Sequence, residues 1–200
     1  MNQKFLLFLC VLFSVSTLSA QKINLGVRGD VTYGRINGDG MSIGYKAGFN
    51  AGGFAEFIVK DRWSVQPELL FSQLNIKIGN FTKYFASSAS EDPGQYAFLS
   101  YVSVPVSLKY KILNLLTVNA GVQYSYLVHA DETLLRDKAE GFKKSDFGLL
   151  AGLEYTPSRL RFYGRYYRSL YDINNINDLH TWYTSQFQAG VGYVLFNKKK

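Results

Sequence analysis

The sequence has little cysteine, little proline and no long hydrophobic run. Its one cysteine, Cys10, lies among the first twenty residues, so removal of that stretch would exclude disulfides, iron–sulfur clusters and cysteine metal sites. The apolar run Phe5–Val15 is too short for a helix to cross a bilayer core of roughly 30 Å, which excludes a helical membrane bundle. With 47% apolar and only 18% charged residues, the chain also lacks the composition of a disordered protein.

Residues 1–20 have the features of a secretory signal peptide. Lys4 is their only charge, the apolar run follows it, and the mostly small residues Ser16–Ala20 precede an expected cleavage site. We therefore predict an exported, cysteine-free mature chain in which residues 21–200 form one domain. The alternative is an uncleaved anchor helix.

The rest of the chain is rich in aromatic residues and glycine, with fifteen Tyr, fifteen Phe and eighteen Gly, a composition typical of strands. Apolar residues recur with a period of two rather than 3.6. No segment with helical periodicity lies between the alternating segments. The sequence therefore predicts eight strands, at 23–33, 45–59, 63–71, 102–110, 116–126, 147–155, 160–167 and 187–195.

The expected connections alternate between short and long. The short ones are residues 60–62, 111–114 and 156–159, and the long ones are 34–42, 79–95, 130–144 and 172–181. Tight periplasmic turns and long external loops are typical of outer-membrane barrels, and an even number of strands puts both termini in the periplasm. We predict an all-β fold, a single eight-stranded antiparallel up-and-down transmembrane β-barrel in the bacterial outer membrane.

The distribution of charge separates this barrel from a soluble, lipocalin-like one, which would bury its apolar face inward. One face of the predicted strands carries ten charged residues, and the opposite face carries none before Arg168. Since one Lys or Arg at the bilayer midplane costs about 2–4 kcal/mol, the charged face must line the lumen. Its members are Arg28, Asp30, Lys46, Glu56, Glu68, Lys109, Asp146, Glu154, Arg161 and Arg165.

Aromatic residues of the apolar phase gather at both ends of the predicted strands, as in the interfacial girdles of membrane barrels. The expected periplasmic girdle comprises Phe57, Trp63, Tyr110, Tyr155, Phe162 and Tyr193. The expected outer girdle comprises Tyr33, Tyr45, Tyr124, Tyr126 and Phe147.

Two features break the strand pattern. Pro67 and Pro105 each remove a donor from the ladder, so we expect a bulge, a kink or a water-filled contact there. After Phe71 the phase changes, with Leu74, Ile76 and Ile78 on the other face. A bulge, or emergence of this strand beyond the bilayer, would account for the change.

Five segments carry a resemblance to a known family: WSVQPELLFSQ from Trp63, YVSVPVSLKY from Tyr101, AGVQYSYLV from Ala120, FGLLAGLEY from Phe147 and FQAGVGYVLF from Phe187. They resemble the outer-membrane beta-barrel domain family, often labelled porin-family or PorT-like proteins. The resemblance implies an eight-stranded barrel, in which the two strand prolines are regular features. It implies no substrate, because fold does not give function.

Three functional hypotheses remain open. The first is a structural or surface-interaction barrel, whose lumen charges pair with one another and with Gln66, Asn119, Gln123, Tyr163 and Tyr167, and whose loops supply contacts through Tyr84, Phe85, Tyr96, Phe142, Asn174, Asn175 and His180. The second is a small porin-like channel for ions or small solutes. The third, an enzyme, is disfavoured because Ser125 and His129 are about 13 Å apart along one strand.

The expected partners are outer-membrane lipid, lipopolysaccharide and the outer-membrane assembly machinery. Arg136, Lys138, Lys143 and Lys144, with Arg168, are candidates to neutralise phosphate. The charge forms no basic stripe, which argues against nucleic acid. We expect no cofactor, metal site or catalytic residue.

Overall fold

The computed structural model describes residues 22–38, 44–77, 96–130, 142–175 and 181–198. The predicted signal peptide lies outside these residues. Their strands are β1 Lys22–Asn37, β2 Lys46–Lys60, β3 Trp63–Lys77, β4 Tyr96–Lys111, β5 Leu116–Ala130, β6 Ser145–Tyr155, β7 Leu160–Ser169 and β8 Tyr183–Lys198. In this described part, no helix has the length and apolarity to cross a membrane.

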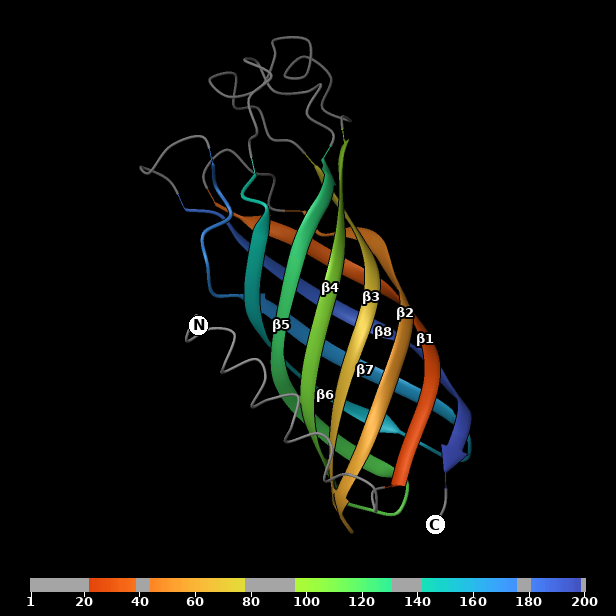
Figure 1. Cartoon of the computed structure of the whole chain (residues 1–200). Helices are drawn as coiled ribbons and strands as arrows, with labels where there is room; N and C mark the ends of the chain where they lie inside the picture. Colours follow the sequence, from red (N-terminus) through yellow and green to blue (C-terminus); the bar gives the residue numbers. More distant parts are fainter. Residues whose placement is uncertain (1–21, 39–43, 78–95, 131–141, 176–180, 199–200) are drawn as a thin grey trace, which may run out of the picture.

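The eight strands form one closed antiparallel barrel in sequence order, sealed by pairing of β8 with β1 (Figure 1). Closure requires the strands to tilt around the axis, and it leaves no unpaired edge. The predicted fold class and strand number are confirmed. We call the end with the short β2–β3, β4–β5 and β6–β7 connections the turn end, and the opposite end the loop end.

The period of two becomes an alternation of exposed and buried side chains. Along β4, Val102, Val104 and Val106 are exposed on the outer surface, whereas Ser103 and Ser107 are buried in the lumen. The barrel therefore has an apolar exterior and a polar interior, the arrangement of a membrane barrel.

The strand irregularities differ from the predicted ones. The β3–β4 register continues without a shift past Pro67 and Leu74, and the β4–β5 register continues past Pro105. The bulge, one of the alternatives expected at the prolines and after Phe71, is therefore wrong at these positions, whereas the kink or water-filled contact at the prolines and the emergence of β3 beyond the bilayer stay predictions. The register shifts instead at Leu25/Gly26, Ile58/Lys60 and Ser100/Tyr101.

The phase change in β3 arises because the lumen is apolar near the loop end. Leu74 is 2% exposed and pairs with the fully buried Leu99. Ile36 and Leu127 are also buried there. The Leu74 side chain reaches Gly34 of β1 and occupies the space in which a side chain at Gly34 would lie. Strand β1 runs to Asn37, four residues beyond the predicted end, because its last residues pair with β8.

Candidate functional site: the lumen

The structure places nine of the ten predicted lumen charges inside the barrel, each less than 9% exposed. The exception in burial is Lys46, which has the same phase but is half-buried at the loop end, opposite Gly34. Eight of the nine form two clusters of side chains that cross the lumen between strands that are not neighbours.

The turn-end cluster comprises Glu56, Lys109, Glu154 and Arg161. The Lys109 Nζ lies 3.2 Å from Glu56 and 2.7 Å from Glu154, and the Arg161 guanidinium binds both carboxylates. Asn24 and Ser64 donate further hydrogen bonds to Glu56, at 2.8 and 2.9 Å. The two positive and two negative charges balance.

The central cluster comprises Arg28, Asp30, Glu68 and Arg165. Arg165 binds Glu68 through two nitrogens, at 3.2 and 2.9 Å, a bidentate geometry that is among the stronger ion pairs. Arg28 donates to the same carboxylate from β1, and its second carboxylate is Asp30, at 3.6 Å. Here too two cations face two anions.

Tyr163 completes the central cluster. Its hydroxyl accepts a hydrogen bond from Arg28 Nε at 2.9 Å and donates one to Asp30 at 2.7 Å. The Arg28 guanidinium also lies 3.6 Å from the centre of the Tyr163 ring, a cation–π contact. An aromatic ring thus occupies space in the lumen and satisfies charged groups at the same time.

Gln66 joins the two clusters. Its amide nitrogen donates to Glu68 at 2.8 Å, and its amide oxygen accepts from Lys109 and Arg161, both at 3.0 Å. One buried amide therefore uses its donor toward the central cluster and its acceptor toward the turn-end cluster, so that the side chains form a continuous network.

Asp146, the ninth buried charge, lies apart from both clusters. Its carboxylate accepts hydrogen bonds from the hydroxyls of Tyr167 and Ser169. Within the described residues it has no ion-pair partner. A row of hydroxyls lies beside it, in which Ser72 donates to Ser103 at 3.0 Å and Ser103 donates to Ser125 at 2.9 Å.

Large side chains fill the lumen against glycines on other strands. The Phe54 ring occupies the space in which a side chain at Gly26 would lie, and the Tyr167 ring does the same at Gly148. Phe54 also lies under the Arg161 guanidinium, 4.8 Å from its carbon. Phe54 was not among the predicted lumen residues, although it lies two positions before Glu56 and so has the same strand phase.

Segments that follow the strands pack together at the loop end. Phe142, Ile173 and Trp182 are buried, with the Phe142 and Trp182 rings 5.6 Å apart. Phe142 and Asn174 were expected to supply exposed contacts. That expectation is wrong, because both are at most 5% exposed, and Phe142 pairs with Asn174 as an isolated bridge.

Asp172 holds these segments. Partial burial raises the pKa of its carboxyl, but hydrogen bonds from the backbone amides of Trp182 and Asn174 and from Lys143 outweigh that effect and lower the pKa. The three donors are 2.7, 2.9 and 3.1 Å away. The carboxylate thereby joins the segment before β6, the segment after β7 and the segment before β8.

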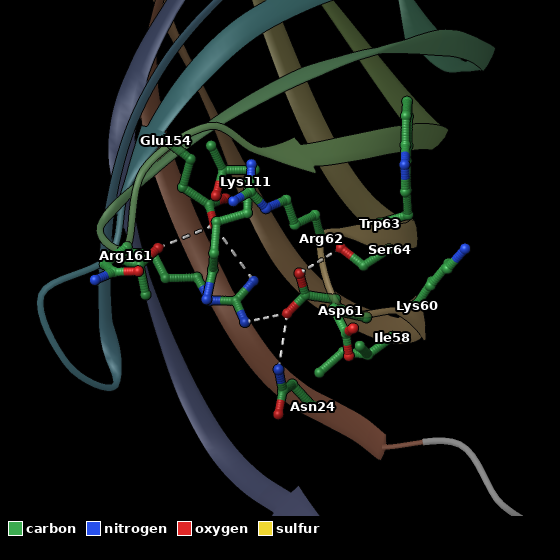
Figure 2. Close-up of a pocket in the computed structure, with 14 residues that line it drawn as sticks. Asn24, Ile58, Lys60, Asp61, Arg62, Trp63, Ser64, Lys111, Glu154 and Arg161 are labelled. Atoms are coloured by element: carbon green, nitrogen blue, oxygen red, sulfur yellow. Dashed lines mark hydrogen bonds and ion pairs between the residues drawn. The ribbon is translucent and has the colours of Figure 1, made fainter.

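The described residues line a cavity at each end of the lumen. The one on the loop side, lined by Asn50, Tyr101 and Gln123 among others, measures about 10 Å³, which is room for about one water molecule. The one at the turn end measures about 180 Å³ and is shown in Figure 2. The side chains of Asn24, Glu154 and Arg161 lie in it together with Arg62 of the β2–β3 turn and Lys111 at the end of β4.

The predicted girdle residues all lie on the outer face. The register places Trp63 beside Tyr110 and Tyr155 beside Phe162 at the turn end. At the loop end Tyr33 stacks on Tyr45, with ring centres 5.4 Å apart. The remaining members, Phe57, Tyr124, Tyr126, Phe147 and Tyr193, are exposed or half-buried on the same face.

The candidates for catalysis do not meet. Ser125 is buried in the hydroxyl row, whereas His129 is exposed at the end of β5. Among the described residues no group of His, Cys, Asp and Glu side chains could hold a metal ion. Of the other predicted loop contacts, Asn175 is exposed, Tyr96 begins β4, and Tyr84, Phe85, His180, Arg136 and Lys138 lie outside the described residues.

Similarity to the solved structure of one outer-membrane protein supports the same fold. The Neisserial surface protein A structure aligns with a TM-score of 0.56 and 13% identity, over 86% of this chain and 97% of that one. The Ail protein of Yersinia pestis aligns with a TM-score of 0.49 and 14% identity, over 86% and 97%. Curated protein sequences yield no significant match.

The family model described as the outer membrane protein beta-barrel domain matches residues 19–175. This match covers more than half of the chain, and it includes all of β1–β7. A β-barrel is the fold that the match implies, and the chain belongs to the outer membrane protein beta-barrel domain family.

Proposed function

We propose that this protein is a closed outer-membrane barrel that acts through its loop end at the cell surface. In this proposal the signal peptide directs export, the assembly machinery inserts the barrel, and the turn end with both termini faces the periplasm. The protein is neither an enzyme nor an open channel. Its lumen network serves to hold the barrel rigid.

The observation that carries the proposal is the binding of Glu68 by two arginines. Glu68 lies on β3, Arg28 on β1 and Arg165 on β7, so the three side chains span the lumen at its centre. An ion that passed through would have to separate these pairs. Breaking a buried ion pair costs about 3–5 kcal/mol, which opposes steady conduction.

The loop-side half supports the same conclusion by a different means. The apolar layer of Ile36, Leu74, Leu99 and Leu127 offers no polar group to a passing ion, and the cavity beneath it is only about 10 Å³. The larger cavity at the turn end is a blind vestibule in this proposal.

Conductance in planar bilayers tests the closed lumen. We expect the purified, heat-modifiable protein to show no steady current, and a variant that combines Arg28→Ala, Glu68→Ala and Arg165→Ala with Leu74→Ala and Leu99→Ala, and so removes both barriers, to show ion conductance. Leu69→Ala, on the outer face beside Glu68, is the matched control and should stay closed. Steady openings of the unaltered protein would establish the channel hypothesis instead.

Labelling of single cysteines tests the orientation. The mature chain has no cysteine, so Thr181→Cys at the loop end and Asn114→Cys at the turn end introduce unique thiols at exposed positions. A membrane-impermeant maleimide should label Thr181→Cys on intact cells, and Asn114→Cys only after the outer membrane is permeabilised. The reverse pattern would contradict the proposed orientation.

A further inference from the structure

Two arginines lie on the outer face of the barrel at the loop end. Arg35 belongs to the part of β1 that was predicted to be a loop, and its guanidinium lies over the outward ring of Tyr45, 4.8 Å from the ring centre. Arg168 is exposed near the end of β7. Both pair with Ser185 of β8, so their backbones flank one strand and are roughly 10 Å apart.

Neither guanidinium is neutralised within the described part of the chain. Arg168 donates a hydrogen bond to the Ser185 hydroxyl at 3.2 Å, and Asn37 donates to the same oxygen at 2.7 Å. The Arg35 Nε is buried without a hydrogen-bond partner. No carboxylate of the described residues lies within ion-pair distance of either arginine, so the pair presents two positive charges to an anion.

An apolar hollow of about 560 Å³ lies on the same strands, nearer the middle of the barrel. Its floor is the register pair Gly164 and Ala189, with the larger Leu153 on one side and Val31 on the other. A Cβ atom at Gly164 would have no other atom within 4 Å, so the space above this residue is open. Across β6, β7, β8 and β1, the outward side chains of this register row are therefore large, small, small and large in turn.

The hollow and the arginines are aligned along β7. Gly164 precedes Arg168 by four residues, roughly 13 Å along a strand. Tyr166 lies between them and packs on Phe187, with ring centres 4.9 Å apart. Ala151, the β6 partner of Tyr166, also lines the hollow, so small side chains continue from the floor toward Arg168.

We infer that this surface binds a phosphorylated lipid, with phosphate at Arg35 and Arg168 and an acyl chain in the hollow. Guanidinium groups suit phosphate because they donate several charge-assisted hydrogen bonds in a plane. A chain in the hollow gains dispersion contacts that a flat barrel surface does not offer. In the proposed orientation, on which the choice of lipid rests, this is the lipid A part of lipopolysaccharide.

Native mass spectrometry of the folded protein in neutral detergent micelles tests the site, and micelles have no sidedness, so the result is independent of the orientation. The probes are bisphosphorylated lipid A, the same lipid without phosphates, and the bisphosphorylated disaccharide without acyl chains. We expect retention of the first to exceed that of either other probe by about tenfold or more, because both parts of the site contribute.

Two substitutions separate the two parts of the site. Arg35→Gln with Arg168→Gln should reduce retention of lipid A to that of its dephosphorylated form. Gly164→Phe should reduce retention of both lipids by filling the hollow. The matched controls are Arg62→Gln, an exposed arginine at the turn end, and Ala51→Phe, on the outer face of β2; both should retain lipid A.

Equal retention of the phosphorylated and dephosphorylated lipids would overturn the inference, as would losses in the controls that match those of the site variants. Heat-modifiable migration on a gel confirms that each variant is folded. The substituted side chains of the site and Ala51 lie on the outer face, and Arg62 makes no ion pair with the described residues of the lumen network, so the network is preserved in every variant.

Discussion

Strand β1 carries one arginine inside the barrel and one outside, and strand β7 carries Arg161 and Arg165 inside and Arg168 outside. The inner pair, Arg28 and Arg165, is buried and shares the carboxylate of Glu68. The outer pair, Arg35 and Arg168, meets no carboxylate of the described residues and lies among tyrosines and phenylalanines. Because alternate positions of a strand face opposite sides of the sheet, the same residue type occurs in two different environments. Inside, the charge is paired within the chain; outside, the described residues supply no counter-charge, and we propose that a lipid phosphate does.

The largest predicted effect comes from removal of the shared carboxylate. Glu68→Ala leaves two buried guanidiniums without their main partner, and loss of one member of a buried pair costs about 3–5 kcal/mol. We expect the free energy of unfolding, measured by urea titration in lipid vesicles, to fall by that amount. Leu69→Ala, the adjacent outward residue, is the control, and an equal loss in both would contradict the role of the network.

A smaller effect is expected at Gln66, which connects the clusters. Gln66→Leu retains most of the volume but removes three hydrogen bonds to charged groups, so we expect a loss of about 1–3 kcal/mol. A double-mutant cycle of Glu68→Ala with Lys109→Ala, in the presence and absence of Gln66, measures the coupling. Coupling that is unchanged by Gln66→Leu would show that the clusters are independent.

The Lys143–Asp172 pair tests an intermediate environment, since the Lys143 side chain is 43% exposed. The folded pKa of Asp172 lies below its usual value, so its stabilising contribution is present above the unfolded pKa, about 3.9, and is lost as the pH falls through the folded pKa. With Trp63→Phe, fluorescence reports Trp182 alone. We expect a red shift in acid at unchanged strand content.

Asp172→Ala is the control for this titration. It should show the shifted emission already at neutral pH, because the backbone amides of Asn174 and Trp182 lose their acceptor. A variant that still titrates in the same pH range would assign the transition to another group.

The smallest effect is expected from the outer arginines. Arg35→Gln and Arg168→Gln in neutral detergent should each change the free energy of unfolding by about 0.5 kcal/mol or less, as surface substitutions do. Arg165→Gln under the same conditions should cost several times more. Similar losses for Arg168→Gln and Arg165→Gln would remove the distinction between the two faces.

The strand number, the closure and the lumen side of the sheet were predictable, because they depend on a period of two and on the cost of charge in lipid. Which charges meet was not. The contact of Glu68 with Arg28 and Arg165 depends on the stagger of the closed sheet, which the period does not contain. The length of β1 was also missed, since Gly34–Asn37 reads as a turn until its pairing with β8 is known.

Other errors concern the loop end. The apolar phase of Leu74 was ascribed to a bulge or to emergence of the strand beyond the bilayer, because the lumen was expected to be polar throughout. Phe142 and Asn174 were taken as exposed because loops are usually exposed. Both errors have one cause: nothing local in the sequence shows that apolar residues close the loop end from within.

Two pairs of adjacent leucines test the central claim most directly. Leu69 and Leu149 are at least 50% exposed on the outer face, whereas Leu70 and Leu150 are at most 3% exposed. In lipid nanodiscs, methyl NMR should show cross-peaks between acyl-chain protons and Leu69 and Leu149, and none to Leu70 and Leu150. Acyl-chain contacts at Leu70 and Leu150, or water contacts in place of lipid at Leu69 and Leu149, would contradict the account.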